Sequence, residues 1–465
     1  MRGSAYRDWL RGRRVSVVGL ARSGVAVAEL LTELGAVVTA TDAKPLSSLS
    51  PEARGLGATG ILLYAGGHPP EAFGDAELVV VSPGVPADHP ALAPVRARGV
   101  PVIGELELAW QVMEAEVIAI TGTNGKTTTT ALVGALLREQ IRPVLVGGNI
   151  GTPLAAHALD FPPGGIVVAE VSSFQLETVE TFRPRVAAVL NLTPDHLDRH
   201  GSFGAYVAAK ARIFENQTER DSAVLNFDDA RTAALAVQTK ADVIFFSRQR
   251  PLERGVFCQD GWILARLNGH TEPICPLGEI SLRGQHNVEN VLAAAACALW
   301  TGIGAASIRT AITAFRAVPH RLEWIRDIGG VAYYNDSKGT NVASTVKALE
   351  SFAEPLILIA GGRGKGQDFA PLAKAAAGRV RLGVLVGEDR DRIGKALAAA
   401  AIPVAPAGSM DEAVRLASAA ARPGEVVLLS PACASFDMFE NFERRGDAFR
   451  AAVLALAAQL QGGVR

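Results

Sequence analysis

The stretch Thr121-Gly122-Thr123-Asn124-Gly125-Lys126-Thr127-Thr128 determines the fold class that we expect of this chain. It follows an apolar run at residues 117–120, typical of a buried strand, and precedes a helix-permissive run at residues 129–140. A strand, a glycine-rich turn and a helix N-terminus together present backbone N–H groups to an anion. Lys126 would neutralise the terminal phosphates of a nucleotide, and the Thr127 hydroxyl would bind Mg²⁺. We therefore predict an α/β domain with a mononucleotide site, for which ATP is the favoured ligand.

The stretch differs from the full phosphate-loop pattern G-x-x-x-x-G-K-[ST], because Ile120 occupies the position of the first glycine. Short Gly-Lys-Thr matches arise by chance, so the motif alone does not establish a nucleotide site. The strand before it and the helix after it are the structural context that the motif requires. This context favours the nucleotide site.

The composition limits the class of protein. A length of 465 residues predicts about three domains at roughly 150 residues each. The 46 basic and 47 acidic residues nearly balance, which argues against a nucleic-acid-binding surface. No apolar run approaches the ~20 residues of a membrane span, and residues 1–12 lack the apolar core of a signal peptide. The four cysteines lack C-x-x-C spacing, so we expect a cytoplasmic chain with reduced cysteines and no membrane partner.

Lysine is rare in this chain: nine of the 46 basic residues are lysine and 37 are arginine. A chain with this bias is expected to keep lysine where a compact, titratable ammonium is needed. Four of the nine lie in the motifs discussed here, namely Lys126, Lys210, Lys338 and Lys365. This concentration supports a functional role for those segments.

Residues 1–104 are predicted to form a Rossmann-like domain, because short apolar strands alternate with helical stretches. The first loop, Gly19 to Gly24, departs from the dinucleotide fingerprint G-x-G-x-x-G, since Ala21 replaces the middle glycine. Asp42, at the end of the second strand, could bond a ribose. This is weak support for NAD, and a phosphate loop for another ligand or a plain strand–helix turn is favoured.

Residues 105–317 are predicted to form the central ATP-binding domain. Strands are expected at residues 165–171 and 186–192, each followed by polar residues. Asp260-Gly261 and Asn268-Gly269 lie between short β-like runs and are typical of hairpin turns. We therefore expect a small antiparallel appendage on this domain.

Residues 318–465 are predicted to form a second doubly wound, Rossmann-like α/β domain, because strands and amphipathic or alanine-rich helices alternate. Three loops of small and polar residues follow its strands, at residues 336–341, 361–366 and 430–435. The carboxyl ends of parallel strands meet at one edge of a sheet. These loops are therefore expected to form a binding edge for an anionic small molecule.

Glu170 ends a strand of the central domain and is placed to bind Mg²⁺ beside Thr127. The alternative is an acidic residue at a helix N-terminus, which is common, but the neighbouring phosphate loop favours the metal. Lys210 lies on an amphipathic helix at residues 206–214. By residue type alone it indicates only a basic side chain on a helix.

His196 and His200 have the His-x-x-x-His spacing of two zinc ligands on one helix face. Pro194 and Gly201 limit any helix here to less than two turns, so hydrogen-bonded structure is favoured over zinc. An indirect role for His196 at Mg²⁺ is the stronger functional hypothesis.

Taken together, these segments resemble the Mur ligase family of peptidoglycan precursor synthesis. The resemblance covers essentially the whole chain, in order. The matching segments occupy residues 19–24, 82–84, 121–128, 148–151, 170–176, 191–198, 286–290, 319–321, 336–341 and 430–442. It implies three α/β domains: a Rossmann-like N-terminal domain for a UDP substrate, the central ATP-binding domain, and a C-terminal domain for an amino acid.

The resemblance implies an ATP-dependent amide-bond ligase that adds D-glutamate to UDP-N-acetylmuramoyl-L-alanine. In this family the carboxylate of the UDP-sugar attacks the γ-phosphate of ATP to give an acyl phosphate, and the amine of the amino acid then displaces phosphate. No covalent enzyme intermediate is needed, so the enzyme supplies positioning and charge neutralisation. The implied partners are these small molecules, and a monomer is expected.

The resemblance also assigns residues by position. The implied ATP contacts are Gly122, Thr123, Asn124, Gly125, Lys126, Thr127, Thr128, Asn287, Arg321 and Asp336. The residues implied around two Mg²⁺ ions are Thr127, Glu170, His196 and Lys210. Lys210 would act as a carbamate, which turns an ammonium into an oxygen ligand that suits a hard cation. Lys126, His196 and Lys210 are the implied catalytic residues.

The implied substrate contacts lie in the outer domains and next to the phosphate loop. Those to the UDP substrate are Leu20, Ala21, Arg22, Asp42, Gly84 and Asn149. Those to D-glutamate are Lys338, Thr340, Lys365, Ser435 and Phe442. Two departures bear on the choice of amino acid: Gly339 stands where alanine is commoner, and the loop around Arg363 is not identical to the usual one.

Three alternatives stay open. A sister ligase would add a different amino acid, although the Asp-Asn-Pro-Arg-type loop of diaminopimelate-adding relatives is absent from the sequence. A dehydrogenase would require the Gly19–Gly24 loop to bind a dinucleotide pyrophosphate. A non-enzymatic nucleotide switch would not need substrate-binding edges on all three domains.

Overall fold

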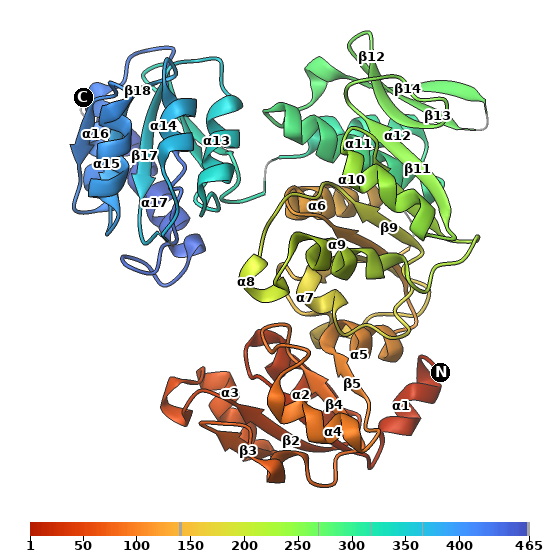
Figure 1. Ribbon diagram of the computed structural model, residues 1–465. Helices are drawn as coiled ribbons and strands as arrows, with labels where there is room; N and C mark the ends of the chain where they lie inside the picture. The colour runs from red at the N-terminus through yellow and green to blue at the C-terminus, as the bar shows by residue number, and fades with distance from the viewer. Residues whose placement is uncertain (139–141, 268, 317, 365, 463–465) are drawn as a thin grey trace. The chain divides into compact units, whose positions relative to one another are not determined.

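The computed structural model describes residues 1–138, 142–267, 269–316, 318–364 and 366–462. The chain folds into two compact units (Figure 1). Unit 1 consists of Met1–Glu279 and Glu289–Thr313, and unit 2 of Ile280–Val288 and Ala314–Arg465. Among the described residues, unit 1 contains two β-sheets and unit 2 contains a third.

The first sheet of unit 1 is parallel, with the strand order β3-β2-β1-β4-β5. The order reverses between β1 and β4, and such a reversal opens a crevice beyond the carboxyl ends of the two strands, where ligands bind in open parallel sheets. The strands are β1 (Arg14–Val18), β2 (Val37–Asp42), β3 (Leu62–Ala65), β4 (Leu78–Val81) and β5 (Val102–Gly104). The helices of this region are α1 (Ser4–Leu10), α2 (Arg22–Glu33), α3 (Pro51–Gly55), α4 (Ala93–Ala97) and α5 (Glu105–Val112).

The second sheet has nine strands in the order β14-β13-β12-β11-β10-β9-β6-β8-β7. β6 lies between β8 and β9, and all three are parallel, so their carboxyl ends meet at one edge. The strands are β6 (Glu116–Thr121), β7 (Val144–Gly148), β8 (Ile166–Glu170), β9 (Val186–Val189), β10 (Ser222–Asn226), β11 (Asp242–Ser247), β12 (Gly255–Gln259), β13 (Trp262–Leu267) and β14 (His270–Pro276). The helices are α6 (Lys126–Leu137), α7 (Ser173–Leu176), α8 (Leu197–His200), α9 (Phe203–Ala211), α10 (Ala230–Ala233), α11 (Gln285–Trp300) and α12 (Ala305–Ala314).

The expected antiparallel strands are present, and they extend the central sheet. β12 pairs in parallel with β11, and β13 and β14 then follow in antiparallel pairing. The turn between β12 and β13 has φ of 50° at Asp260 and 79° at Gly261, the left-handed geometry that an Asp-Gly turn favours. Asn268, in the second expected turn, lies outside the described residues.

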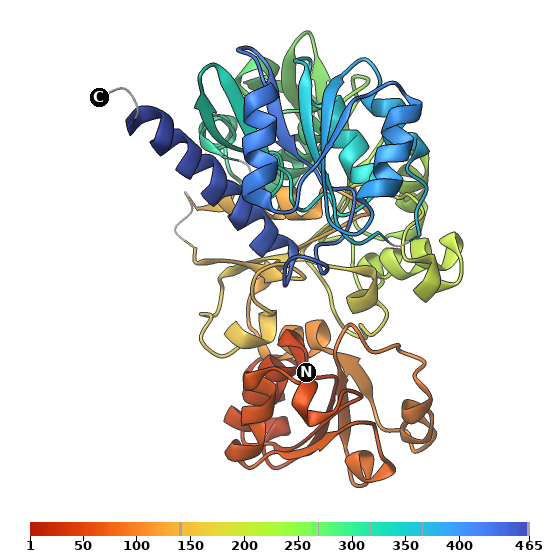
Figure 2. The same ribbon diagram turned by 90° about the vertical axis from the view of Figure 1, so that its left-hand side faces the viewer.

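The sheet of unit 2 is parallel except for its edge strand β15, in the order β15-β16-β20-β17-β18-β19. The strands are β15 (Glu323–Ile328), β16 (Val331–Asn335), β17 (Leu356–Gly361), β18 (Val380–Val386), β19 (Val404–Pro406) and β20 (Val426–Leu429). The helices are α13 (Val342–Glu350), α14 (Ala370–Ala376), α15 (Arg390–Ala399), α16 (Met410–Ala420) and α17 (Phe442–Gly462), the long helix that ends the described chain in Figure 2.

The third sheet is buried on both faces, as expected of a doubly wound domain. Alternate residues of β17 point to opposite faces. Leu358 belongs to an apolar cluster with Leu349 of α13, whereas Ile359 belongs to a second cluster with Phe449 of α17. Because both faces are covered, this strand is a continuous apolar run and does not alternate with polar residues.

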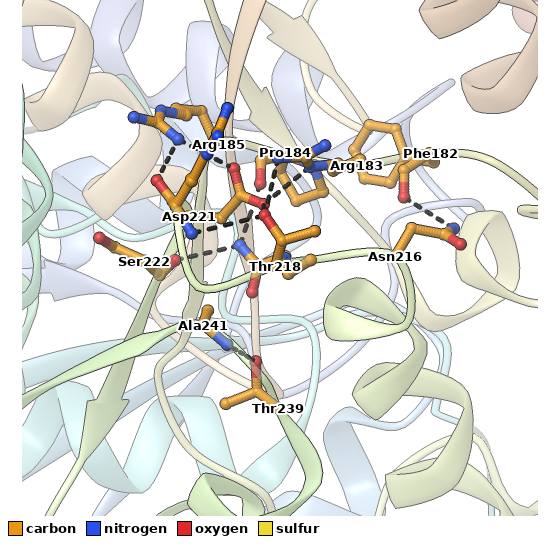
Figure 3. A network of polar contacts seen from close by, with 12 residues as sticks. Phe182, Arg183, Pro184, Arg185, Asn216, Thr218, Asp221, Ser222, Thr239 and Ala241 are labelled. Atoms are coloured by element: carbon orange, nitrogen blue, oxygen red, sulfur yellow. Dashed lines mark hydrogen bonds and ion pairs between the residues drawn. The ribbon is translucent and has the colours of Figure 1, made fainter.

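A polar network joins the amino ends of β9 and β10, opposite the carboxyl edge of the sheet (Figure 3). The buried Asp221 accepts a hydrogen bond from Arg183 Nε at 2.7 Å and one from the Thr218 backbone at 2.8 Å. Arg185 Nη1 lies 3.3 Å from the other carboxylate oxygen of Asp221. These contacts hold the segment before β10 against the segment before β9.

Two elements differ from the expected bounds because of the phosphate loop. α6 begins at Lys126, three residues before the expected helix, since Gly125 adopts φ 85° and ends the turn directly before it. β9 ends at Val189, three residues before the expected end. The following residues leave the sheet, and the Thr123 N–H donates to Asn191 O at 2.9 Å.

The three sheets fall within the three predicted domains, 1–104, 105–317 and 318–465. The chain has the three-domain α/β fold expected from the sequence. The exact limits of the domains stay a prediction, since the two sheets of unit 1 share one apolar core that includes Leu106 of α5, Val17 of β1 and Val167 of β8.

Candidate active site

The glycine-rich loop between β6 and α6 is shaped by its glycines. Gly125 has φ 85°, a conformation that residues with a Cβ rarely adopt. A Cβ at Gly125 would also overlap the side-chain oxygen of Asn290. Gly122 has φ 144° and packs against the backbone of Leu190. The sequence therefore forms this turn only with glycine at these two positions.

The loop is supported from the segment that follows β9. The Asn124 N–H donates to Asn191 Oδ1 at 2.8 Å, and Asn191 Nδ2 donates back to Asn124 O at 3.0 Å. The Thr193 N–H donates to Thr123 Oγ1 at 3.0 Å. This paired set of contacts explains why the residues after β9 are polar.

Lys126 is the first residue of α6 and folds back over the loop. Its Nζ donates to Gly122 O at 3.0 Å and to Thr123 O at 2.9 Å. The ammonium is thereby held beside the loop N–H groups that would face a phosphate. The role of Lys126 in neutralising phosphate charge stays a prediction.

A line of hydrogen bonds joins Thr127, Glu170 and Asn149. Thr127 Oγ1 donates to Glu170 Oε2 at 2.7 Å, and Asn149 Nδ2 donates to Glu170 Oε1 at 2.7 Å. The buried Glu170 ends β8 and thus lies next to β6 at the carboxyl edge of the sheet. The structure brings together a predicted ATP contact, a predicted metal ligand and a predicted contact to the UDP substrate.

Lys210 is buried, with 1% of its surface exposed, on α9. Burial lowers the pKa of its amine well below the usual value, and the positive charge of Lys126 lowers it further, although Asp195 and Glu170 oppose the shift. Its Nζ donates to Thr121 Oγ1 at 3.1 Å. With its lowered pKa, the Lys210 amine loses its proton more readily than an exposed lysine amine does.

Tyr206 is a residue of this region that sequence reasoning missed. Its hydroxyl lies 3.0 Å from Thr123 Oγ1, and its ring centroid lies 4.9 Å from Lys210 Nζ. Tyr206 and Lys210 are four residues apart, the spacing of neighbours on one helix face. This spacing is the signal that could have identified Tyr206.

His200 is part of a hydrogen-bonded cluster, as favoured over zinc. Its Nε2 lies 3.0 Å from Ser173 Oγ and its ring stacks on Phe174 at 5.5 Å between centroids. His196 precedes α8 with φ 50°, and its Nε2 lies 3.7 Å from Asp195 Oδ2. Within the described ranges, no group of three or more His, Cys, Asp or Glu side chains is placed to hold a metal.

The loops with the predicted UDP-substrate contacts follow β1, β2 and β4, at the carboxyl edge of the first sheet. Asp42 accepts a hydrogen bond from the Leu20 N–H at 2.6 Å and one from the Lys44 N–H at 2.8 Å. Its carboxylate therefore shapes the Gly19–Gly24 loop. Ser82 Oγ donates to Gly19 O at 2.6 Å, which ties the second loop to the first. Ala21 directly precedes α2, Arg22 is the first residue of this helix, and Gly84 lies in the second loop.

In unit 2, Asp336 lies directly after β16 and is buried. Ser430 Oγ donates to Asp336 Oδ2 at 2.7 Å, and the Leu322 N–H donates to Oδ1 at 3.3 Å. Burial raises the pKa of the carboxyl group to about 7, although the Ser430 hydrogen bond and the charge of Arg321 oppose the shift.

This shift predicts a pH dependence of stability. The pKa of Asp336 is about 7 in the folded chain and 3.8 in the reference state, so the folded state binds more protons between these values. The free energy of unfolding should therefore fall as pH rises from about 4 to 7, and the Asp336→Asn variant should lack this component. Urea unfolding of both proteins at several pH values measures the effect, and parallel pH curves would contradict the assignment.

The remaining ATP candidates are Asn287, in the first residues of α11, which belong to unit 2, and Arg321. Asn287 is buried near the start of α11, where its Nδ2 donates to Arg283 O at 2.7 Å. Arg321 lies in a tight turn, since His320 has φ 65° and Leu322 has φ 44°. Such positive φ values in non-glycine residues store strain and are concentrated at functional sites.

The predicted amino-acid contacts lie on loops of unit 2. Lys338 Nζ lies 3.7 Å from the ring centroid of Phe442, a cation–π contact between two of them. Thr340 follows in the same loop, and its N–H donates to Lys338 O at 2.7 Å. Ser435 is buried in the loop after β20. Lys365, the fifth predicted contact, lies outside the described residues.

Gly339 and Arg363, at the two departures from the family pattern, each make close contacts with neighbouring loops of unit 2. A Cβ at Gly339 would lie 2.6 Å from Asp336 Oδ2 and 2.8 Å from Ser430 Oγ, so alanine would require these groups to shift. Arg363 donates to both carboxylate oxygens of Glu388, at 2.9 and 2.7 Å, and its backbone pairs with Ala434. Both residues therefore bear on the loops with the predicted amino-acid contacts.

The known domains that match this chain cover it from near its start to the loop after β20. Residues 13–104 match the Mur ligase MurD-like N-terminal domain, residues 120–298 the Mur ligase middle domain, and residues 320–433 the glutamate ligase domain of Mur ligases. The chain belongs to the Mur ligase family.

Relatives that align with almost the full length of this chain share one printed activity. The UDP-N-acetylmuramoylalanine-D-glutamate ligase of Acidobacterium capsulatum is 50% identical over 448 residues, which cover 96% of this chain and 97% of that protein. The enzyme of the same name from Pelotomaculum thermopropionicum is 48% identical over 452 residues, which cover 97% and 99%. The UDP-N-acetylmuramate-alanine ligase of Thermotoga maritima shares the fold, with a TM-score of 0.60 at 20% identity over 95% of this chain and 99% of that one.

In the described part of the chain, no helix is both long enough and apolar enough to cross a membrane.

Proposed function

We propose that this chain is an ATP-dependent ligase that joins D-glutamate to UDP-N-acetylmuramoyl-L-alanine in peptidoglycan precursor synthesis in the cytoplasm. The full-length relatives with 50% and 48% identity bear the name of this activity. The structural observation that supports it best is the line Thr127–Glu170–Asn149, which joins the phosphate loop to the residue expected to meet the UDP substrate.

The first step of the proposed reaction is attack by a substrate carboxylate oxygen on the γ-phosphorus of ATP. The new O–P bond gives an acyl phosphate, and the bond to the β-phosphate oxygen breaks to release ADP. Lys126 and the N–H groups of residues 122–128 would neutralise the charge on the transferred group. Asn287, Arg321 and Asp336 are the proposed further ATP contacts.

In the second step the amine of D-glutamate attacks the acyl carbon, and phosphate leaves from the tetrahedral intermediate. The two carboxylates of D-glutamate would be recognised by a cation and hydroxyl groups. The proposed contacts are Lys338, Thr340, Lys365, Ser435 and Phe442. The proposed contacts to the UDP substrate are Leu20, Ala21, Arg22, Asp42, Gly84 and Asn149.

The donor set beside the phosphate loop fits Mg²⁺. The Thr127 hydroxyl and the Glu170 carboxylate are oxygen ligands, and Mg²⁺ is commonly bound by one or two carboxylates together with substrate phosphates and water. When bound, Mg²⁺ would neutralise phosphate charge. His196 would act indirectly in this set, next to Asp195.

Lys210 is proposed to join this set as a carbamate, for a second Mg²⁺. A neutral amine reacts with CO₂ to form a carbamate and release one proton, and the lowered pKa of Lys210 favours the neutral amine. The product carries two oxygens where the ammonium had none, which suits a hard cation.

We propose that the enzyme acts as a monomer.

The function is tested by phosphate release from ATP and UDP-N-acetylmuramoyl-L-alanine with a panel of amino acids. Turnover is expected with D-glutamate and not with L-alanine or diaminopimelate. Turnover with another amino acid in place of D-glutamate would refute the proposed specificity, and phosphate release without any amino acid would indicate a nucleotide switch or a simple hydrolase.

A further inference from the structure

Arg199 of α8 joins two loops that are far apart in the sequence. Its guanidinium donates to Val85 O at 3.1 Å and lies 3.5 Å from Gly84 O, in the loop after β4. It also donates to Glu177 Oε2 at 2.6 Å, just after α7. All of these residues belong to unit 1.

The contacts of Arg199 to Gly84 and Val85 hold the loop after β4, at the carboxyl edge of the first sheet. The Val85 N–H donates to Ser82 O at 2.9 Å, and Ser82 Oγ donates in turn to Gly19 O. The guanidinium is therefore bonded to a loop that is itself fastened to the glycine loop after β1. Gly84 in this loop is a proposed contact to the UDP substrate.

The contact of Arg199 to Glu177 holds the segment after β8. Glu177 Oε1 lies 3.4 Å from His200 Nδ1, whose other ring nitrogen contacts Ser173 of α7. The guanidinium carbon of Arg199 also lies 5.0 Å from the ring centroid of Phe174. α7 begins three residues after Glu170, so this segment leads to the proposed metal ligand.

α8 is a very short helix. It spans four residues between His196, with φ 50°, and Gly201, with φ 71°. The Arg199 and Glu177 side chains are each 17% exposed, so the ion pair is largely withdrawn from solvent and is screened less by salt than an exposed pair. Arginine suits this position because its planar fork can bond a carboxylate and a carbonyl at once, which a lysine ammonium does less well.

We propose that Arg199 is a positioning residue that couples the loop at residues 82–85 to its own helix α8, which follows His196, and to the segment that ends at Glu177. The inference rests on the proposed function. A substrate whose nucleotide end is held by the loop at residues 82–85 must present its carboxylate at the phosphate loop. A small misplacement of reacting groups lowers the rate of reaction strongly. Arg199 fixes one end of this span relative to the other.

In the described part of the chain, the Arg199 side chain donates hydrogen bonds to Gly84, Val85 and Glu177, which are not residues of the phosphate loop. The loop is held by Asn191 and Thr193, as described above. Loss of the guanidinium should therefore weaken binding of the nucleotide sugar and leave binding of ATP nearly unchanged. A residue with a merely structural role would lower stability without separating the two substrates.

The test measures kcat and the KM of each substrate for Arg199→Met, Arg199→Lys and Glu177→Gln. We expect the KM for UDP-N-acetylmuramoyl-L-alanine to rise about tenfold in Arg199→Met, which corresponds to about 1.4 kcal/mol, with a smaller rise in Arg199→Lys. The KM for ATP should stay within about twofold. Arg231→Met is the matched control, because Arg231 is an exposed arginine that packs on Phe203 and is outside this network.

A double variant tests the coupling itself. If Arg199 and Glu177 act as one unit, Arg199→Met/Glu177→Gln should be no worse than Arg199→Met alone. An unchanged KM for the nucleotide sugar in Arg199→Met and Arg199→Lys would overturn the inference, as would an equal rise in both KM values. Failure of the unaltered enzyme to turn over the nucleotide sugar with any amino acid would instead refute the proposed function.

Discussion

Turnover of the Lys210→Ala variant should fall roughly 100- to 1,000-fold, the loss seen when one group that stabilises a transition-state charge is removed. Lys210 is 1% exposed and adjoins the phosphate loop through Thr121. The variant would lose the proposed carbamate and with it an oxygen ligand for the second Mg²⁺. Phosphate release under saturating substrates measures the effect.

Chemical rescue distinguishes the carbamate from a structural role of Lys210. A short carboxylic acid such as acetate fits the space that the side chain vacates, and should restore part of the activity of Lys210→Ala. Lys240→Ala is the control, because Lys240 is exposed, and it should keep full activity. A fully active Lys210→Ala enzyme would contradict the assignment, and a loss of activity that acetate does not relieve would argue against the carbamate.

The sequence could predict Glu170 and Thr127 as neighbours for a physical reason. Glu170 ends one apolar strand, Thr127 lies at the start of the helix that follows another, and parallel strands bring such positions to one edge. β6 and β8 do pair in parallel, and the two side chains are joined by a hydrogen bond of 2.7 Å. The same reasoning placed the loops after β16, β17 and β20 on one edge of the third sheet.

Contacts between distant side chains could not be predicted in this way. Arg199 and Val85 are separated by 114 residues, and no periodicity in either segment indicates their hydrogen bond. The pattern of Lys210 on an amphipathic helix likewise gave no indication of a function. Its burial arises because α9 packs its Tyr206 face against the phosphate loop, which depends on tertiary structure.

Arg445 should be among the most destabilising positions to change. It is 1% exposed on α17, and its guanidinium donates to Ser337 Oγ at 2.9 Å, Ser337 O at 2.8 Å and Cys433 O at 3.0 Å. Arg445→Met would leave these three acceptors without their donor, and each unsatisfied buried group costs about 1–3 kcal/mol. Removal of a buried charge offsets part of this cost. We expect the free energy of unfolding to fall by roughly 3 kcal/mol, measured by urea denaturation.

The adjacent Arg444 provides the matched control, since it is exposed on the same turn of α17. Arg444→Met should change the free energy of unfolding by less than about 0.5 kcal/mol. Arg445→Lys keeps the charge but lacks the planar guanidinium that bonds Ser337 and Cys433 together. Its free energy of unfolding should therefore lie between those of Arg445→Met and Arg444→Met. Ser337 and Cys433 lie in loops that carry proposed amino-acid contacts, and a Cβ at Gly362 in the third loop would lie 3.2 Å from Arg445 Nη1. The KM for D-glutamate in Arg445→Lys should therefore rise more than the KM for UDP-N-acetylmuramoyl-L-alanine. A free energy of unfolding of Arg445→Met equal to that of the unaltered protein would show that other contacts hold these loops.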